Sequence, residues 1–467
     1  MTDKEFECGL HITEENFLDN VDKLIKIIKN SPEYLKLADC TQMIFDKKGK
    51  NRVNNRQTHT NSVASLALKL AQKFRMSKME QKLAELIGLC HDLGHTAFGH
   101  TGESRIDKVL LYYDIPAKEF NDAYSKQNNM PELLIQHGYK ETDHSFEHHA
   151  HSRRVIRKIL KDNDVIIDSN ILSDLEWGIL CHSESRVKDD KVTKILWTLA
   201  RYADKFYAFT DVYDTIKSEN YIPGDILYRI KNEGNIENYF KEGFNLEQKD
   251  FEQFSAILGV FEQGDAISYF VQKYIEEAQI VEDNGHYCIE TETEIGRQMR
   301  LLQGVMRYMR EKGFVGKEEK LANAMIDEII AYKIHYANNE ILDHKDKVIN
   351  ACLFVSMSTD TELRDFYRVI SKNKEWIEFF DEKMKNNKEF ETEVEQEERE
   401  YIRNNPDIIL NYYFNTEIDK VNDLDIRTKL YGKLIEYRTK PTLKLRRKLI
   451  EQIEFAQSGG DPFTKGR

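Results

Sequence analysis

Hydrophobic and polar positions along this chain alternate with the period of an α-helix. Between residues 63 and 74, apolar side chains fall at i, i+3, i+4, i+7 and i+11, namely Val63, Leu66, Ala67, Leu70 and Phe74. This spacing predicts a helix with one buried face, preceded by Thr60 or Asn61 as candidate N-caps. A second stripe runs from Leu83 to Cys90 and predicts another helix, which ends after His91 at a turn containing Gly94.

Composition favours an all-α fold. The 467 residues include only 7 Pro and 22 Gly. Both fractions lie below the usual background of about 5% Pro and 7% Gly in proteins. Sandwiches, barrels and propellers need more of these turn residues. The chain is also too long for a single minimal core, so we expect one large helical body or two closely packed helical layers.

Charge and cysteine usage narrow the class further. The formal net charge is −13, from 68 basic and 81 acidic residues, which works against broad binding to nucleic acid or anionic membranes. The N-terminal sequence MTDKEFECGL lacks the pattern of a secretory signal, and no apolar run is long enough to span a bilayer. The six cysteines lie far apart and form no C-x-x-C pair. We therefore expect a cytoplasmic protein without membrane contact, with reduced and mostly buried thiols.

Histidines are concentrated in one part of the chain. Nine of the fourteen lie between residues 59 and 151. At the centre is LIGLCHDLGHTAFGHTGE, residues 86–103, where an apolar helix leads into the adjacent pair His91 and Asp92. A His-Asp pair alone is weak evidence, because such dipeptides arise often by chance.

Two further residues make a metal site the preferred interpretation. His59 lies at the start of the upstream helix, and Asp204 lies in the downstream segment LARYADKFYAFTDVYD. Together with His91 and Asp92 they give two imidazoles and two carboxylates from three predicted helices. This donor set suits Mn²⁺, Fe²⁺, Co²⁺, Ni²⁺ or Mg²⁺ better than a thiolate-preferring structural zinc. The alternative is a group of buried histidines that pair with neighbouring acids.

These motifs resemble those of a known family. RQTH, LIGLCHDLGHTAFGHTGE, FEHHAHSRRV, ILCHSE and the YAD of LARYADKFY are similar to the motifs of the HD-domain deoxynucleoside triphosphate triphosphohydrolases, the dGTPase-like group. The resemblance covers residues 31 to 215. It implies a helical HD-domain core with additional C-terminal helices, and it implies that His59, His91, Asp92 and Asp204 are the metal ligands.

The resemblance also implies a catalytic pair, His100 and Glu103. At i and i+3 these residues would share a helical face, so Glu103 could orient or stabilise the charge of His100 while the imidazole acts as general acid or base. The alternative roles are a passive phosphate donor for His100 and a helix N-terminal carboxylate for Glu103.

Further positions match substrate contacts of the family. Arg56 occupies the R-x-x-H position, where a guanidinium can bind phosphate oxygens, with a surface salt bridge as the alternative. Gln42 falls where similar enzymes carry a glutamine beside the deoxyribose. His148 and His149 correspond to positions that face the phosphates and sugar, although a His-rich second metal site is an alternative.

Tyr207 and Asp211 are the last candidate substrate contacts. They follow Asp204 by three and seven residues, whereas family members place the equivalents at four and eight. One residue rotates a helical side chain by about 100°, so a local turn or bulge must compensate if they act on the sugar. Core packing is the alternative for Tyr207.

By this resemblance the chain is expected to hydrolyse a dNTP, dGTP first among them, to deoxynucleoside and inorganic triphosphate. The alternatives are another HD-domain nucleotide phosphohydrolase and a nucleotide-binding sensor with negligible turnover. The expected organisation is an N-terminal helical segment contributing to the pocket (1–49), the HD core (50–215), a C-terminal helical region completing the site and oligomer contacts (216–456) and a flexible tail (457–467). Similar enzymes are homo-oligomers, and a nucleotide or single-stranded DNA effector is possible.

Overall fold

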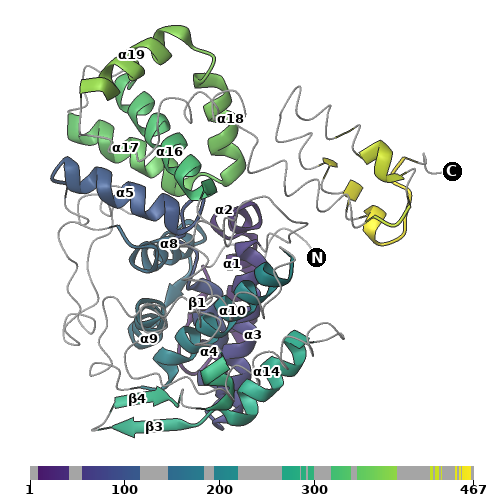
Figure 1. Cartoon of the computed structure of the whole chain (residues 1–467). Helices are drawn as coiled ribbons and strands as arrows, with labels where there is room; N and C mark the ends of the chain where they lie inside the picture. Colours follow the sequence, from purple (N-terminus) through teal and green to yellow (C-terminus); the bar gives the residue numbers. More distant parts are fainter. Residues whose placement is uncertain are drawn as a thin grey trace, which may run out of the picture.

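In the computed structural model, the secondary structure of the described residues is almost all helical, as the composition predicts (Figure 1). It describes residues 9–40, 55–115, 146–182, 194–218, 266–283, 286–290, 293–298, 317–337, 344–386, 421–423, 426–430, 433, 448–449, 452–453 and 455–463. Among these, the strands are β1 (His11–Ile12), parallel to β2 (Ile166–Ile167), and the antiparallel pair β3 (Ile280–Asp283) and β4 (His286–Ile289). Within the described residues, no helix has both the length and the apolar character required to cross a membrane.

A first apolar core joins helices from the N-terminal half and the middle of the chain. They are α1 (Phe17–Asn30), α3 (Arg56–Lys73), α4 (Lys78–Cys90), α8 (His148–Asp162), α9 (Ser169–Cys181), α10 (Leu196–Ser218) and α14 (Ala266–Glu277). The short α2 (Pro32–Leu35) and the 3₁₀ helix η1 (Lys36–Asp39) follow α1. The predicted stripe of α3 is buried from Val63 to Leu70, and Phe74 packs partly against the same core.

The start of α3 differs from the expectation. The helix begins at Arg56, and its N-cap is Asn55, whose side chain accepts a hydrogen bond from the backbone of Thr58. Thr60 and Asn61, the candidate caps, lie inside the helix. The apolar stripe begins one turn after the helix does, because the first turn carries polar side chains, among them Arg56 and His59, that are buried at the site.

A second apolar core forms around α5 (His100–Tyr112). It contains α16 (Lys317–His335), α17 (His344–Met357), α18 (Asp360–Ile370) and α19 (Lys374–Asn386). Figure 1 shows α5 beneath these C-terminal helices, and α8 and α9 with the first group. A bidentate ion pair, from Arg105 to Asp327 on α16, fixes α5 against its neighbours at 2.7 and 2.6 Å.

The segment between α4 and α5 therefore connects the two cores. Residues 91–99 leave α4, which packs in the first core, and enter α5, which packs in the second. Ala97 and Phe98 already belong to the second core. The histidine-rich motif is thus held from both sides.

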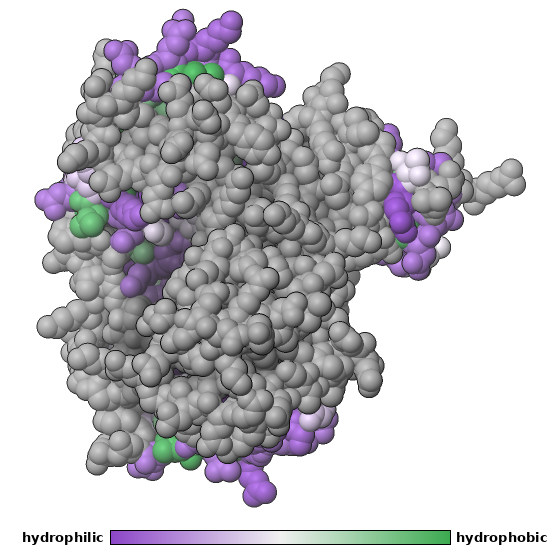
Figure 2. All heavy atoms as spheres, viewed as in Figure 1, coloured by the Kyte–Doolittle hydropathy of each residue, from purple (hydrophilic) through white to green (hydrophobic). Residues whose placement is uncertain are grey.

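The described surface is mixed in polarity, and the described thiols are mostly buried, as the sequence predicts. On the face shown in Figure 2, apolar side chains of described residues appear as small, separate patches among hydrophilic ones, as is common for protein surfaces. Cys40, Cys90, Cys181 and Cys352 are buried free thiols, and Cys288 is half-buried. Burial raises the pKa of Cys40 to about 12.

Candidate metal and phosphate site

The four predicted metal ligands lie together. His59, on the first turn of α3, places Nε2 2.8 Å from Oδ1 of Asp204 on α10. Nε2 of His91 lies 3.5 Å from Oδ2 of Asp92 and 3.8 Å from Oδ1 of Asp204. Residues separated by up to 145 positions in the sequence thus bring nitrogen and oxygen donors to one point.

The direction of the His91 ring is fixed by the end of its helix. His91 is the C-cap of α4, and Nδ1 lies 2.7 Å from the carbonyl oxygen of Gly88. Because a carbonyl only accepts, Nδ1 carries the proton and Nε2 presents its lone pair. That Nε2 is buried and has no hydrogen-bond partner among the described residues. A buried lone pair facing two carboxylates fits a divalent cation.

The turn after His91 is shaped by close packing against α8. The backbone N–H of Gly94 donates to Oγ of Ser152, and that hydroxyl donates to the carbonyl of His91. A Cβ at Gly94 would lie 2.2 Å from the backbone nitrogen of Ser152. Glycine is therefore required where α8 meets the turn.

Arg56 lies directly behind the site. Its Nη1 donates to Oδ2 of Asp92 at 2.7 Å, and both side chains are buried. Gly99 has φ +60°, and a Cβ there would lie 2.7 Å from Nη2 of Arg56. The glycine thus provides both the left-handed turn and the space for the guanidinium. The alternative of a surface salt bridge is wrong for Arg56, because its ion pair is buried.

His100 and Glu103 are in contact at the start of α5. Nδ1 of His100 lies 2.8 Å from Oε2 of Glu103, as their i, i+3 spacing favours. The imidazole of His100 is 73% exposed, whereas the Glu103 side chain is 15% exposed. An exposed ring held by a half-buried carboxylate can meet a ligand while keeping a fixed orientation.

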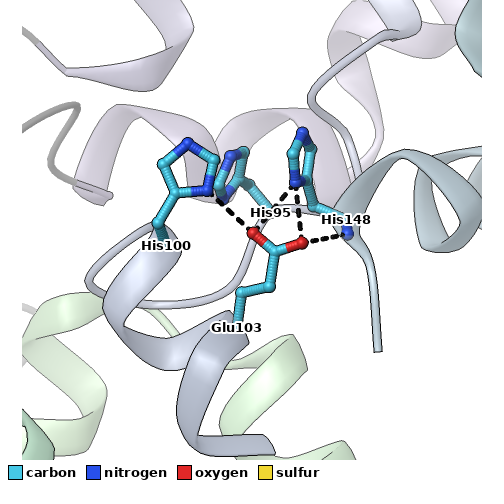
Figure 3. A group of neighbouring side chains, drawn as sticks. All are labelled: His95, His100, Glu103 and His148. Atoms are coloured by element: carbon cyan, nitrogen blue, oxygen red, sulfur yellow. Dashed lines mark hydrogen bonds and ion pairs between the residues drawn. The ribbon is translucent and has the colours of Figure 1, made fainter. Parts of the chain in front are cut away.

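His148 completes this group from α8. Figure 3 shows His100 and His148 converging on the Glu103 carboxylate, with His95 beside them. Nδ1 of His148 lies 3.0 Å from both carboxylate oxygens, and its backbone N–H donates to Oε1 at 2.8 Å. The His95 ring stacks on that of His148 at 4.1 Å. Glu103 is thus the acceptor that joins α5 to α8.

The carboxylates of the site are ionised at neutral pH. Burial raises the pKa of Asp92, but the charges of His91, His95, Arg56 and His148 outweigh it and hold the pKa well below its usual value. Burial also opposes ionisation of Asp204, yet its hydrogen bond and charge interaction with His59 lower the pKa. For Glu103, His148 and His100 likewise outweigh burial and keep the pKa well below normal.

The histidines differ in their protonation. Burial holds the pKa of His95 and of His182 well below normal, and neighbouring positive groups add to that effect. Burial also lowers the pKa of His149. For His148, burial acts in the same direction, but the charge and hydrogen bonds of Glu103 outweigh it and raise the pKa. Burial therefore favours the neutral form of His95, His149 and His182, which can donate a lone pair to a cation, whereas Glu103 favours the protonated form of His148.

The remaining sequence candidates are placed as follows. His149 is buried, with Nε2 2.7 Å from Oε2 of Glu147, and its ring lies 5.6 Å from that of His148. Tyr207 meets the edge of His59 at 6.4 Å between ring centres while packing partly against the first core. Gln42 and the side chain of Asp211 lie outside the described residues.

Two histidines at the site received no role from the sequence. His95 places Nε2 3.8 Å from Oδ1 of Asp92, and His182 places Nε2 3.0 Å from Nε2 of His148. For His182 a signal existed: Leu180-Cys181-His182 repeats the Leu-Cys-His of residues 89–91 at the end of another apolar helix.

Comparison with known proteins identifies the helical frame of this site. The family model of the HD domain matches residues 56–208, which include all the described candidates. Residues 56–208 therefore form an HD domain, an all-helical fold that typically depends on a divalent metal.

Curated relatives match over a shorter stretch. A "Deoxyguanosinetriphosphate triphosphohydrolase-like protein" of Agrobacterium fabrum is 37% identical over 102 residues, which is 22% of this chain and 23% of that protein. Proteins of the same name from Allorhizobium ampelinum and Rhizobium meliloti are 34% and 36% identical over 105 and 101 residues. The similarity thus spans less than a quarter of the length of these relatives.

Proposed function

We propose that this chain is a divalent-metal-dependent triphosphohydrolase that cleaves dNTPs, dGTP first among them, to deoxynucleoside and inorganic triphosphate. The HD domain and the names of the relatives support a metal-dependent phosphohydrolase. The observation that carries the proposal is the convergence of His59, His91, Asp92 and Asp204, with nitrogen and oxygen donors 2.8 to 3.8 Å apart.

His59, His91, Asp92 and Asp204 would hold the ion. A divalent ion bound there supplies Lewis-acid polarisation of a phosphoryl oxygen. Nδ1 of His91 donates a hydrogen bond to the carbonyl oxygen of Gly88, so Nε2 stays directed at the proposed metal position. Arg56 holds Asp92 from the other side and brings a permanent positive charge close to where the triphosphate would lie.

His100 is the proposed general acid or base. Its ring is the exposed member of the histidine group, so it can approach the 5′ oxygen that leaves or the water that attacks. Glu103 accepts from Nδ1, which leaves Nε2 for proton transfer and stabilises the imidazolium. His148, beside this pair, is proposed to contact the phosphates, and His149, Gln42, Tyr207 and Asp211 remain predicted substrate contacts.

Product analysis tests the proposal. The purified chain is incubated separately with each of the four dNTPs and Mn²⁺ or Mg²⁺, and the products are resolved by ion-exchange chromatography. Deoxynucleoside with tripolyphosphate is the expected result, and it also ranks the bases. Monophosphate with pyrophosphate would instead identify another HD-domain phosphohydrolase.

Variants at the ligands connect activity to the site. His91→Ala and Asp92→Ala should each abolish turnover and metal binding while the circular dichroism spectrum stays helical. His11→Ala, at an exposed position on β1, is the matched control. If the wild type binds dNTPs but forms no product with any metal or candidate effector, the result would favour a nucleotide-binding sensor with negligible turnover. Homo-oligomerisation and a nucleotide or single-stranded DNA effector also remain predictions.

A further inference from the structure

Two neighbouring residues at the start of α18 reach two different segments beside the candidate site. The carboxylate of Asp360 accepts the backbone N–H of Phe98, in the turn that leads into α5. The hydroxyl of Thr361 donates to Oδ1 of Asp39, the last residue of η1, at 2.8 Å, although 322 residues separate the two. Asp360 and Thr361 are both buried. One helix of the second core therefore bonds to the turn and to η1 at once.

Both of these segments contact Arg56. Its backbone N–H, at the first residue of α3, donates to the carbonyl oxygen of Cys40 at 3.0 Å, and Cys40 directly follows Asp39. The guanidinium, at the other end of the residue, lies against Gly99, which directly follows Phe98 in the turn. The backbone of Arg56 is thus held through the end of η1, and its guanidinium is confined by the turn.

Arg364, one turn further along α18, fixes the direction of the Thr361 hydroxyl. Its Nη2 donates to Oγ1 of Thr361 at 3.0 Å, and its Nε donates to the carbonyl oxygen of Asp360 at 2.9 Å. Because the hydroxyl oxygen accepts from a guanidinium, its single proton is directed to Asp39, where an ionised carboxylate only accepts. Charge-assisted bonds thus run from Arg364 through Thr361 to Asp39.

The opposite end of η1 is held against the second core as well. Nζ of Lys36, the first residue of η1, donates to the carbonyl oxygen of Ser356 on α17 at 2.6 Å. Between the two ends, the apolar side chain of Leu37 packs in the first core. The short helix therefore lies between the two cores, with apolar packing on one side and directional polar contacts on the other.

We propose that Thr361 is a positioning residue for Arg56. It fixes the end of η1 through Asp39, and the end of η1 fixes the backbone from which the guanidinium extends. The inference rests on the proposed function, because it concerns the contact of Arg56 with the triphosphate. A guanidinium binds phosphate oxygens in a planar, bidentate geometry, which depends on the direction of the side chain. Loss of the Thr361 hydroxyl should thus weaken binding of the triphosphate group and leave the metal content unchanged.

Binding of inorganic tripolyphosphate measures this role without the sugar and the base. Isothermal titration calorimetry of the full chain, in a fixed excess of Mn²⁺, gives the dissociation constant. Thr361→Val, which keeps the shape of the side chain, should raise it by about 3- to 30-fold, within the range of coupling in one hydrogen-bond network. Thr361→Ser retains the hydroxyl and should stay near the wild type. Thr198→Val is the matched control, since the hydroxyl of this buried threonine bonds only to the carbonyl three residues earlier among the contacts described.

A double-mutant cycle with Arg56→Gln separates positioning from a general loss of structure. In the Arg56→Gln background, Thr361→Val should cause no further loss of tripolyphosphate affinity, because the guanidinium that it positions is gone. Circular dichroism and the bound Mn²⁺ content check that each variant is folded and loaded. If Thr361→Val does not fold, Asp39→Ala, at a half-buried position, removes the same bond from the side of η1 and should give the same loss.

Unchanged affinity in Thr361→Val and in Asp39→Ala would overturn the inference. An equal loss on Thr361→Val in the wild-type and Arg56→Gln backgrounds would overturn it too, and so would a wild type that binds no tripolyphosphate. Absence of dNTP hydrolysis, in a protein whose tripolyphosphate affinity follows the expected cycle, would instead contradict the proposed function and leave the role of Thr361 intact.

Discussion

Oδ1 of Asp360, on α18, accepts the backbone N–H of Phe98 at 2.7 Å, although 262 residues separate them in the sequence. Phe98 has φ +56°, a left-handed backbone conformation that residues other than glycine rarely adopt. Gly99 and His100 follow it directly. A C-terminal helix therefore holds the turn that delivers the proposed general acid or base.

Asp360→Ala should destabilise the protein and slow turnover. The buried N–H of Phe98 would lose its acceptor, which costs about 1–3 kcal/mol. Urea denaturation followed by circular dichroism measures the loss, and steady-state kinetics measures kcat. Asp360→Asn keeps an acceptor oxygen and should lie nearer the wild type. Equal stability of the alanine variant and the wild type would contradict this role.

His100→Ala should lower kcat by about 10²- to 10⁴-fold, the range of a lost general acid or base, with metal content unchanged. Its ring is 73% exposed, so the free energy of unfolding should change by less than about 0.5 kcal/mol. Glu103→Gln should also lower kcat, because it removes the charge that orients the ring. His11→Ala serves as the exposed-histidine control. Unchanged kcat in His100→Ala would exclude His100 from proton transfer.

Arg105→Met should destabilise the chain by about 3–5 kcal/mol, because Asp327 would stay buried without its bidentate guanidinium. The double variant Arg105→Met with Asp327→Leu should recover much of this loss, since it removes both charges. Chemical denaturation gives the values. Lys273→Met, in an exposed ion pair with Glu276, is the control and should change stability by at most about 1 kcal/mol. A similarly small effect of Arg105→Met would show that the buried pair is dispensable.

Lys36 should make the free energy of unfolding vary with pH in the alkaline range. It is half-buried, its Nζ donates to the carbonyl of Ser356 at 2.6 Å, and removal of the amine from solvent lowers its pKa from 10.5. Between the lowered folded pKa and 10.5, the unfolded chain binds the proton and the folded chain does not. The free energy of unfolding contributed by this residue therefore rises with pH through that interval.

Comparison with Lys36→Met isolates this contribution. Urea denaturation at several pH values from 7 to 10 should show wild-type stability rising relative to the variant, which has no titrating amine at this position. A constant difference between the two proteins over this range would contradict the lowered pKa.

The sequence by itself determined the helical class and which residues are candidates for the site. Few Pro and Gly residues, the 3.6-residue apolar period and the H…HD…D spacing are local properties, so they can be recognised without a fold. The helix through Leu83 and Cys90 ends at His91 for a local reason too, since the apolar pattern stops there. The i, i+3 contact of His100 with Glu103 follows from helix geometry alone.

Only the tertiary structure decided which distant groups meet. The sequence predicted that Arg56 binds phosphate oxygens. The packing of α3 beside the turn that follows α4 also pairs its guanidinium with Asp92. His182 approaches His148 because α9 packs against α8 in the first core, and Asp360 reaches Phe98 because α18 packs with α5 in the second. These contacts depend on how apolar faces are shared between helices far apart in the sequence, and the period of one helix carries no information about its partner.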